Sequence, residues 1–250
     1  MATGMAGVSG PRGDPAAALS RFRPIGAAYL RFARDEPAFS PPRSPRRMYL
    51  LVCTLAAMDA RERLIESTRE LLWDRGYVGT SPKAIQQRSG AGQGSMYHHF
   101  GGKRELALAA IERNGADLVA RAEADLAGPG AVTARIARYM RRERAFLRGC
   151  PVGRLTMDPD VMASQDLSEP VRDALAAVRG RLAGVLDEGR RNGELDPSID
   201  PAAIATVLTA VLQGGYVLAR ASGSADTYTQ AVDGILGLLA CRTRTGGADA

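Results

Sequence analysis

From residue 59 onward, apolar and polar positions recur with the period of an amphipathic α-helix. In the first such stretch the apolar side follows the spacing i, i+1, i+4, i+7 and i+8. Its members are Leu64, Ile65, Thr68, Leu71 and Leu72. We predict a helix here that ends at Gly76, because glycine favours the position after the last helical turn.

Two short helices and a long one are predicted next. Ser81 is a good N-cap and Gly90 a good stop, so only a short helix fits between them. The segment QGSMYHHF, residues 93–100, is confined in the same way by the glycines on either side. A longer helix is predicted over residues 103–126. A long helix, a short helix, a tight turn and a second short helix form the helix-turn-helix pattern.

The rest of the chain is also predicted to be helical. We expect one helix over residues 131–149, one opened by Pro170 that runs to 192–193, one that starts at Pro201, and a last one over 225–240. No segment shows the strict alternation of a half-buried strand, and the aromatic content of 5% is low for a sheet protein. The sequence therefore predicts an all-α protein.

Residues 1–57 differ from the rest of the chain. They hold eight arginines against three acidic residues, most of the chain's net charge of +6, and show no helical or strand period. Their one apolar run is too short to cross a bilayer, so no membrane partner is expected. Two interpretations stay open: a disordered basic arm, or an upstream extension, with translation beginning at Met48 or Met58 instead of Met1.

The cysteines argue for a reducing compartment. Cys53, Cys150 and Cys241 lie far apart, and no cysteine or histidine pair has metal-ligand spacing. We therefore predict neither a disulfide framework nor a metal or other cofactor, and a cytoplasmic location.

Both histidines of the chain, His98 and His99, lie in the second short helix. Neighbouring positions on a helix point about 100° apart, so the pair cannot chelate one ion together. Ser95 shares a helical face with His98, but no carboxylate stands near in sequence to orient a Ser–His pair. Neither a metal site nor an enzyme is predicted here.

The same segment suits nucleic acid better. The second short helix of a helix-turn-helix lies in the major groove, with its N-terminal residues facing base edges. Gln93 can pair with adenine through two hydrogen bonds, and Ser95 can reach several base edges. Candidate donors to phosphate oxygens are Tyr97, His98, His99 and Lys103.

Residues 64–106, LIESTRELLWDRGYVGTSPKAIQQRSGAGQGSMYHHFGGKREL, resemble the DNA-binding domain of the TetR family of bacterial transcriptional repressors. The matching positions are Leu64–Leu72, Gly76-Tyr77, Thr80-Ser81, Ile85, Gly90, Gly94, Tyr97, His99-Phe100, Lys103 and Leu106. Two positions depart from the family's pattern. Gln86 stands where a small residue usually follows Ile85, and Gly92 replaces the usual serine cap of the recognition helix.

The resemblance implies a role for each matching polar residue. Phosphate contacts would come from Thr80, Tyr97, His99 and Lys103, and groove contacts from Gln93, Ser95, Tyr97 and His98. Ser81 completes the predicted DNA-contacting set, and Phe100 would lie in the core.

The resemblance also implies that the larger C-terminal domain binds a small molecule and forms a homodimer. The last two predicted helices are apolar on more than one face, as a four-helix dimer interface requires, and Gly214-Gly215 would permit close approach of the partner. Two buried helices of a monomer remain the alternative. Candidate ligand-binding residues, which equally suit ordinary core packing, are Tyr139, Met140, Phe146, Met157 and Met162.

The segment GCPVGRLTMD, residues 149–158, resembles the LmrA/YxaF-like branch of these regulators. Its Cys150 is interpreted as a small buried residue at a turn, with a redox switch as the alternative.

The sequence thus predicts a four-part chain. Residues 1–57 and 243–250 are terminal tails, 58–105 a helix-turn-helix DNA-binding domain, and 106–242 a helical ligand-binding and dimerisation domain. The predicted function is a cytoplasmic repressor that binds operator DNA as a homodimer and is released by a small molecule. The rivals are a regulator controlled by a partner or by redox state, and a helical carrier or enzyme with a vestigial helix-turn-helix.

Overall fold

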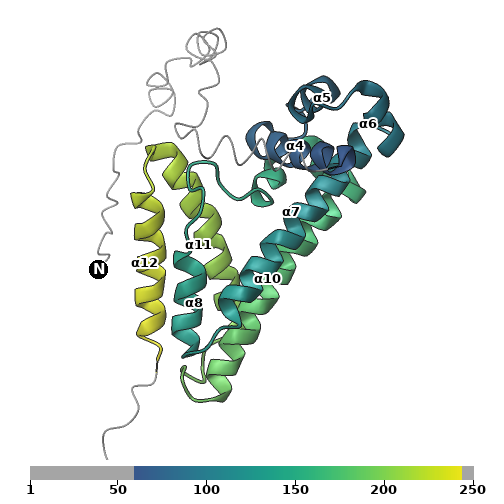
Figure 1. Cartoon of the computed structure of the whole chain (residues 1–250). Coiled ribbons are helices and arrows are strands. Elements are labelled where there is room, and N and C mark those ends of the chain that lie inside the picture. Colours follow the sequence, from purple (N-terminus) through teal and green to yellow (C-terminus); the bar gives the residue numbers. More distant parts are fainter. Residues whose placement is uncertain (1–58, 244–250) are drawn as a thin grey trace, which may run out of the picture. The chain divides into compact units, whose positions relative to one another are not determined.

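The computed structural model describes residues 59–243 of the chain (Figure 1). The predicted tails and the alternative starts fall outside these residues, Thr243 excepted. The helices, labelled as in Figure 1, are α4 (Ala60–Arg75), α5 (Pro82–Ser89), α6 (Gln93–His99), α7 (Lys103–Leu126), α8 (Val132–Arg141), the 3₁₀ turn η1 (Gly153–Met157), α9 (Pro159–Ala163), α10 (Gln165–Arg191), α11 (Pro201–Ser222) and α12 (Asp226–Ala240). Apart from one isolated bridge between Leu195 and Thr243, regular structure in the described range is helical, which confirms the all-α prediction.

The first four helices form where the local signals place them. Gly76 follows α4, the Ser81 hydroxyl accepts from the Ala84 amide at 3.2 Å to cap α5, and Gly90 takes the left-handed conformation that ends it. Helix α6 starts after Gly92 with no side-chain cap, as that departure from the family pattern implies.

Two predicted boundaries are wrong. The helix expected over 131–149 stops at Arg141, and the chain then turns irregularly to Gly149. The Arg144 guanidinium donates to the Tyr139 carbonyl, one of the last-turn carbonyls that a continued helix would satisfy. Helix α10 begins at Gln165, and Pro170 lies inside its second turn, where the missing N–H removes one backbone hydrogen bond.

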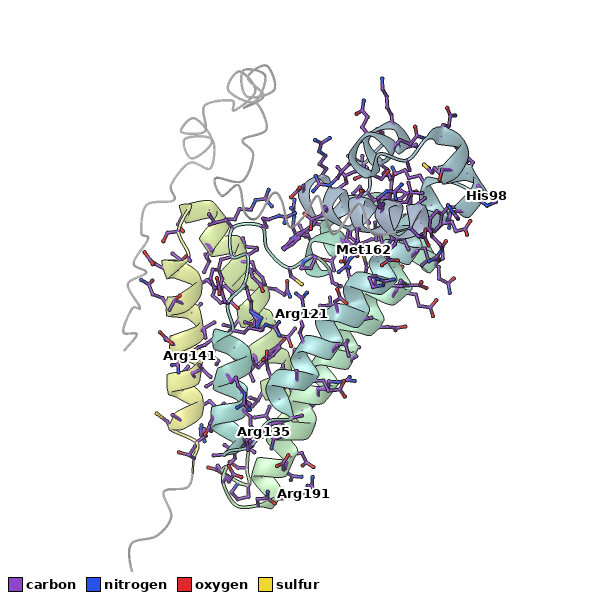
Figure 2. The ribbon with its side chains drawn as sticks, viewed as in Figure 1. His98, Arg121, Arg135, Arg141, Met162 and Arg191 are labelled. Carbon is purple, nitrogen blue, oxygen red and sulfur yellow. The ribbon has the colours of Figure 1, made fainter. Side chains whose placement is uncertain are left out.

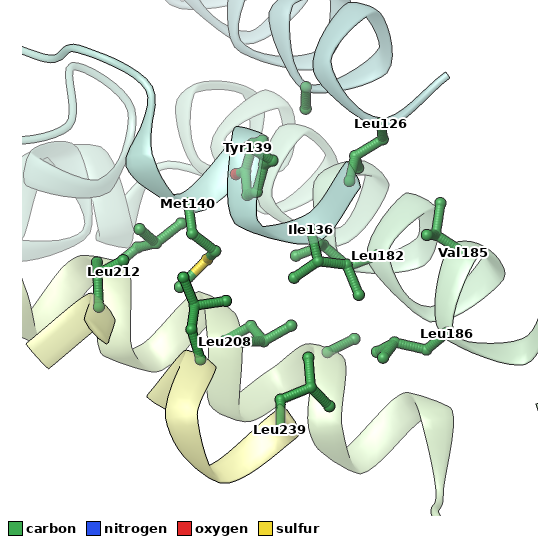
Figure 3. Packing of buried hydrophobic residues seen from close by; sticks show 14 of the residues in the cluster. Leu126, Ile136, Tyr139, Met140, Leu182, Val185, Leu186, Leu208, Leu212 and Leu239 are labelled. Atoms are coloured by element: carbon green, nitrogen blue, oxygen red, sulfur yellow. The ribbon is translucent and has the colours of Figure 1, made fainter. Parts of the chain in front are cut away.

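Three groups of buried apolar residues hold the described helices together. One lies within the helix-turn-helix and consists of Leu64, Ile65, Leu71, Ile85, Ala91, Met96, Phe100 and Leu106. A second joins α4 to the C-terminal body and includes Leu72, Ile111, Cys150, Leu155 and Val171. The third fills the space between α8, α10, α11 and α12, where Figure 3 shows Ile136, Met140, Leu182 and Leu208 interlocked.

Helix α7 connects these groups. It begins in the helix-turn-helix and runs beside α10 along the C-terminal body, where α8 packs on α7, α11 packs on α10, and α12 packs on α11 and α8 (Figure 1). The boundary predicted at residues 105–106 therefore falls within the first turn of one continuous helix. No irregular linker interrupts α7 between the helix-turn-helix and the C-terminal body.

Candidate DNA interface and ligand cavity

Helix α6 presents most of the residues predicted to contact DNA. Gln93, Tyr97 and His98 are exposed, and Ser95 and His99 are half-buried. Tyr97 keeps 52% of its surface exposed, so its ring and hydroxyl are accessible to a partner. Figure 2 shows His98 at the outer end of the helix-turn-helix, away from the C-terminal body.

The opposite face of α6 fixes its position. Met96 and Phe100 are buried in the same apolar group as Ile85 of α5 and Leu64 of α4, as predicted for Phe100. Gln86, the departure from the family pattern, lies between the two short helices, and its amide nitrogen is 3.6 Å from the Met96 sulfur. The larger side chain is therefore accommodated by contact with a flexible methionine.

The structure places Thr80 and Ser81 differently from each other. Thr80 is 1% exposed, and its hydroxyl donates to the Gly76 carbonyl at 2.6 Å. Ser81 is exposed while it caps α5. In this structure the Thr80 side chain closes the turn between α4 and α5. Its only hydroxyl hydrogen is already donated to the Gly76 carbonyl, so the hydroxyl cannot donate to a phosphate at the same time.

Lys103, at the start of α7, is held in a defined position. Its ammonium lies 3.9 Å from the centre of the Tyr77 ring, a cation–π contact. Burial lowers the pKa of Lys103 and raises the pKa of Tyr77. His98 and His99 contact each other edge to face, with ring centres 4.9 Å apart. These rings and the ammonium are fixed donors at one end of α6.

Asp158, between η1 and α9, joins the C-terminal body to the helix-turn-helix. Its carboxylate is 8% exposed and accepts from the backbone N–H groups of Tyr77 at 2.7 Å and Val78 at 3.1 Å. The other carboxylate oxygen caps α9 by accepting from Val161 at 3.2 Å. Gly76 makes room for this approach, since a Cβ there would lie 2.7 Å from the oxygen that accepts from Tyr77.

Further bonds tie α4 and α7 to the segment that comes after α8. The Trp73 indole donates to the Gly149 carbonyl at 3.0 Å, and Arg148 lies over the Trp73 ring at 3.7 Å while it pairs with Asp74. Arg104 of α7 pairs with Asp166 at the start of α10 and holds the pKa of that carboxyl well below its usual range. The helix-turn-helix is thus attached at several points.

A cavity of about 350 Å³ lies between α4, α7, the end of α8 and α11. That volume is at the lower end of the range typical of small-molecule sites. Its aromatic wall consists of Trp73, Tyr139 and Tyr216. Burial raises the pKa of Tyr139 to about 12 and also raises that of Tyr216, so both are neutral phenols at physiological pH.

The five residues predicted to bind a ligand are dispersed. Tyr139 lines the cavity, Met140 is fully buried in the third apolar group, and Phe146 packs on Tyr228 with ring centres 4.6 Å apart. Met157 is 85% exposed beside a second, shallower hollow, and Met162 lies exposed on α9 (Figure 2).

Sequence reasoning missed the polar residues that line the cavity, among them Arg69, Asn114, Arg121 and Arg144. They come from α4, from α7 and from the segment after α8, and only the fold brings these three parts of the chain together. Cys150 also borders the cavity, is 4% exposed and accepts from the Gly153 amide at 3.2 Å, which suits the interpretation as a small buried residue at a turn.

Comparisons with known proteins agree with this arrangement. Residues 64–110 match the family model for bacterial regulatory proteins of the tetR family, and residues 130–235 match the tetracyclin repressor-like C-terminal domain. The chain is 29% identical over 168 residues to the HTH-type transcriptional regulator LmrA of Bacillus subtilis, covering 64% of this chain and 86% of LmrA.

Two solved structures share the fold. The reduced form of Escherichia coli NemR superimposes with a TM-score of 0.63 at 27% identity, covering 71% of this chain and 95% of that one. A TetR transcriptional regulator from Chloroflexus aurantiacus gives a TM-score of 0.68 at 25% identity, covering 74% and 96%. With both of its domains matched and the helix-turn-helix in place, the chain belongs to the TetR family of transcriptional regulators.

Proposed function

We propose that this protein is a cytoplasmic repressor that binds operator DNA as a homodimer and leaves it when a small molecule occupies the C-terminal cavity. The observation that carries the proposal is α6, which is packed firmly on one side and presents exposed hydrogen-bonding side chains on the other. Several relatives are themselves named repressors, NemR of Escherichia coli among them.

Gln93 and Ser95, at the N-terminal end of α6, would read base edges in the major groove. Tyr97, His98, His99, Lys103 and the exposed Ser81 would contact the groove edge and the phosphates. The cation–π contact holds the Lys103 ammonium in place before DNA arrives, which lowers the entropy lost on binding. We assign the domains as 58–105 for DNA and 106–242 for ligand and dimer.

The dimer would form through α11 and α12. One face of α11 carries small and apolar side chains at alternating steps of four and three residues, the spacing of a helix–helix seam. The members of this seam are Ala203, Val207, Ala210, Gly214, Val217 and Ala221, and all are exposed. Leu218 and Leu238 extend the apolar surface, with 52% and 67% exposed.

By length and composition, α11 is also the one described helix that could cross a membrane. Only 28% of its most apolar 18-residue stretch is buried within the described chain, so most of that stretch is left exposed. An exposed apolar face of this kind needs a cover. A second copy supplies one by symmetry and also brings two recognition helices to the two half-sites of an operator.

Release would depend on the segment 142–158. Its first part lines the cavity, and its end carries the Asp158 bond to Tyr77 and Val78 of the helix-turn-helix. A ligand that prefers one arrangement of this segment would change the separation of the two recognition helices, and only such differential affinity shifts the equilibrium.

The test is binding to the DNA upstream of the protein's own gene, measured by mobility shift at several salt concentrations. A specific, salt-sensitive complex is expected, and its absence would contradict the proposal. Lys103→Ala should weaken binding to all sequences and flatten the salt dependence by about one unit of slope. Gln93→Ala should instead change which bases are preferred, and unchanged preference would refute the assignment to the groove.

A further inference from the structure

We propose that the effector is a small organic anion, a carboxylic acid with an aromatic or apolar body, bound in the cavity by Arg121 and Arg144. This inference rests on the proposed function for its regulatory consequence, whereas the ligand class stands on the charges and donors of the cavity alone. The charged groups around the cavity differ in whether they already have a partner of opposite charge.

Most of the charged residues around the cavity compensate one another. Arg69 pairs with Glu66 and Asp117, and its Nε donates to the Asn114 amide oxygen at 2.8 Å. Arg142 pairs with Asp125 at 2.7 Å. Glu70 pairs with Arg148 at 2.9 Å. These groups form the polar rim, and each of their three arginines already has a carboxylate partner, so none of them offers a free cation to a ligand.

Arg144 is different because its partners are all neutral. Its guanidinium donates to the Tyr139 carbonyl and, at 3.0 Å, to the Tyr228 hydroxyl, and lies 5.0 Å from the centre of the Tyr139 ring. The described chain offers this half-buried cation no carboxylate. The tyrosines cannot compensate it either, since burial raises their pKa values, Tyr139 to about 12. A partly desolvated cation without a counter-ion favours a bound anion, because a charge-assisted hydrogen bond offsets the cost of its burial.

Two further donors line the same cavity. The Asn114 side chain is 4% exposed, and its amide nitrogen has no hydrogen-bond partner among the described residues, a state that costs free energy unless a ligand satisfies it. Arg121 lies on α7 toward α8 (Figure 2) and makes no ion pair within the described chain. Glu143 is the one carboxylate at the rim that has no ion pair in the described range. It is exposed and therefore hydrated, so its charge repels a bound anion only weakly.

The apolar residues that line the cavity determine which non-acidic part of a ligand it can hold. Trp73, Tyr139 and Tyr216 present aromatic rings, and Leu118 and Leu212 add apolar surface. In a cavity of about 350 Å³ this leaves space for one ring or a short chain attached to the acid. A purely apolar ligand would leave Arg144 and the Asn114 amide unsatisfied, and a cation would be repelled.

Trp73 is the only tryptophan of the chain, so its fluorescence reports on this cavity directly. The full-length protein is titrated, without DNA, with phenylacetate and 4-phenylbutyrate, with the two matching amides, and with phenethylamine. We expect saturable quenching by at least one acid, with affinity at least about tenfold above that of its amide. No saturable binding of either acid at millimolar concentration, or equal affinity for acid and amide, would overturn the proposal.

The variants locate the charge. Arg121→Gln removes an exposed group without an ion pair, so the protein should fold normally, and acid affinity should fall about tenfold while amide affinity stays unchanged. Arg144→Gln should do the same, with its thermal unfolding recorded because the guanidinium also bonds to Tyr139 and Tyr228. Arg172→Gln, an exposed arginine of α10 outside the cavity, is the matched control. Acid affinity that survives Arg121→Gln and Arg144→Gln would refute the site.

A mobility shift with the same acid separates the two proposals. Lowered affinity for the upstream DNA identifies the acid as a member of the effector class. An acid that binds in the cavity but leaves DNA affinity unchanged would overturn the effector role. Failure of the protein to form any specific DNA complex would instead refute the proposed function, while the quenching experiment still decides the ligand class.

Discussion

Asp158 provides the sharpest test of how the C-terminal body holds the helix-turn-helix. Its carboxylate accepts from Tyr77 and Val78 on the turn after α4 and from Val161 at the start of α9. The side chain is 8% exposed, so water replaces these bonds poorly after truncation. We therefore predict that Asp158→Ala destabilises the protein and loosens the turn between α4 and α5.

The magnitude can be worked out from the bonds that are lost. Hydrogen bonds to a charged group contribute about 1.5–3 kcal/mol each, and loss of an N-cap costs about 1 kcal/mol. These terms are not additive, and about 3 kcal/mol is the expected loss in the free energy of unfolding for Asp158→Ala. For a folded region of this size that corresponds to a fall in Tm of roughly 6–12 °C. Asp158→Asn keeps an acceptor but loses the charge, and should cost about half as much.

Chemical denaturation with circular dichroism measures the unfolding free energy of each variant, and Asp160→Asn is the control. Asp160 is exposed two residues away, so its substitution should stay within about 0.5 kcal/mol of the wild type. If Asp158→Ala proves as mild as that control, the carboxylate does not join the two parts as the geometry indicates.

A double-mutant cycle with Gly76 isolates the contact itself. Gly76 has φ 72° and ψ −177°, a region that only glycine adopts readily, and a Cβ there would also collide with the Asp158 carboxylate. Gly76→Ala should therefore destabilise strongly, and less so when Asp158 is already alanine. Coupling of about 1 kcal/mol or more is expected, and strict additivity would refute the close approach.

Three further changes test other parts of the structure. We expect a dimer for the wild type by light scattering and a monomer for Val217→Glu, while Ala202→Glu, exposed on α11 away from the seam, should remain dimeric. Gly215→Ala should lower the free energy of unfolding by about 1–3 kcal/mol, because its Cβ would lie 2.8 Å from the Tyr228 ring. Gly180→Ala, with open space around it, should be neutral or slightly stabilising, and equal effects of the two variants would contradict this packing. The unfolding free energy should fall as pH rises from about 10 to about 12, because the folded state holds the Tyr139 proton up to a pKa of about 12 while the unfolded chain releases it near 10. Tyr139→Phe should reduce the slope of unfolding free energy against pH in this range by up to about 1.4 kcal/mol per pH unit, and an unchanged slope would refute the assignment.

The helix-turn-helix was predictable because its signals are local. The cap at Ser81 and the glycines at 76 and 90 each act within one turn of their own position, and the structure uses them as expected. The end of α8 was not predictable, since it depends on the Arg144 side chain returning to the Tyr139 carbonyl beside a cavity built from distant elements. In the sequence, the charged residues 141–144 are compatible with a continuing solvated helix, so they do not indicate that α8 ends at Arg141.

The cavity was less predictable for a related reason. Methionine and aromatic content cannot separate a pocket from a packed core, and Met140 is core while Met157 is exposed. Asn114 is a polar residue within a helix, which in sequence is typical of a solvated position, yet the fold buries it. Gly215 was expected to admit a partner helix, but it admits the Tyr228 ring of its own chain.

Helix α4 shows why a ligand and DNA would compete in this fold. Leu71 packs into the group of apolar residues that supports α6, while its neighbour Leu72 packs into the group beneath the cavity. Trp73, one residue further, lines the cavity itself. Because the three residues share one helix, we expect a ligand that displaces Trp73 and the backbone of α4 with it to move the support of the recognition helix as well. In a dimer both copies must meet fixed half-sites at once, so a small rotation of α4 in each would be sufficient to mismatch the operator.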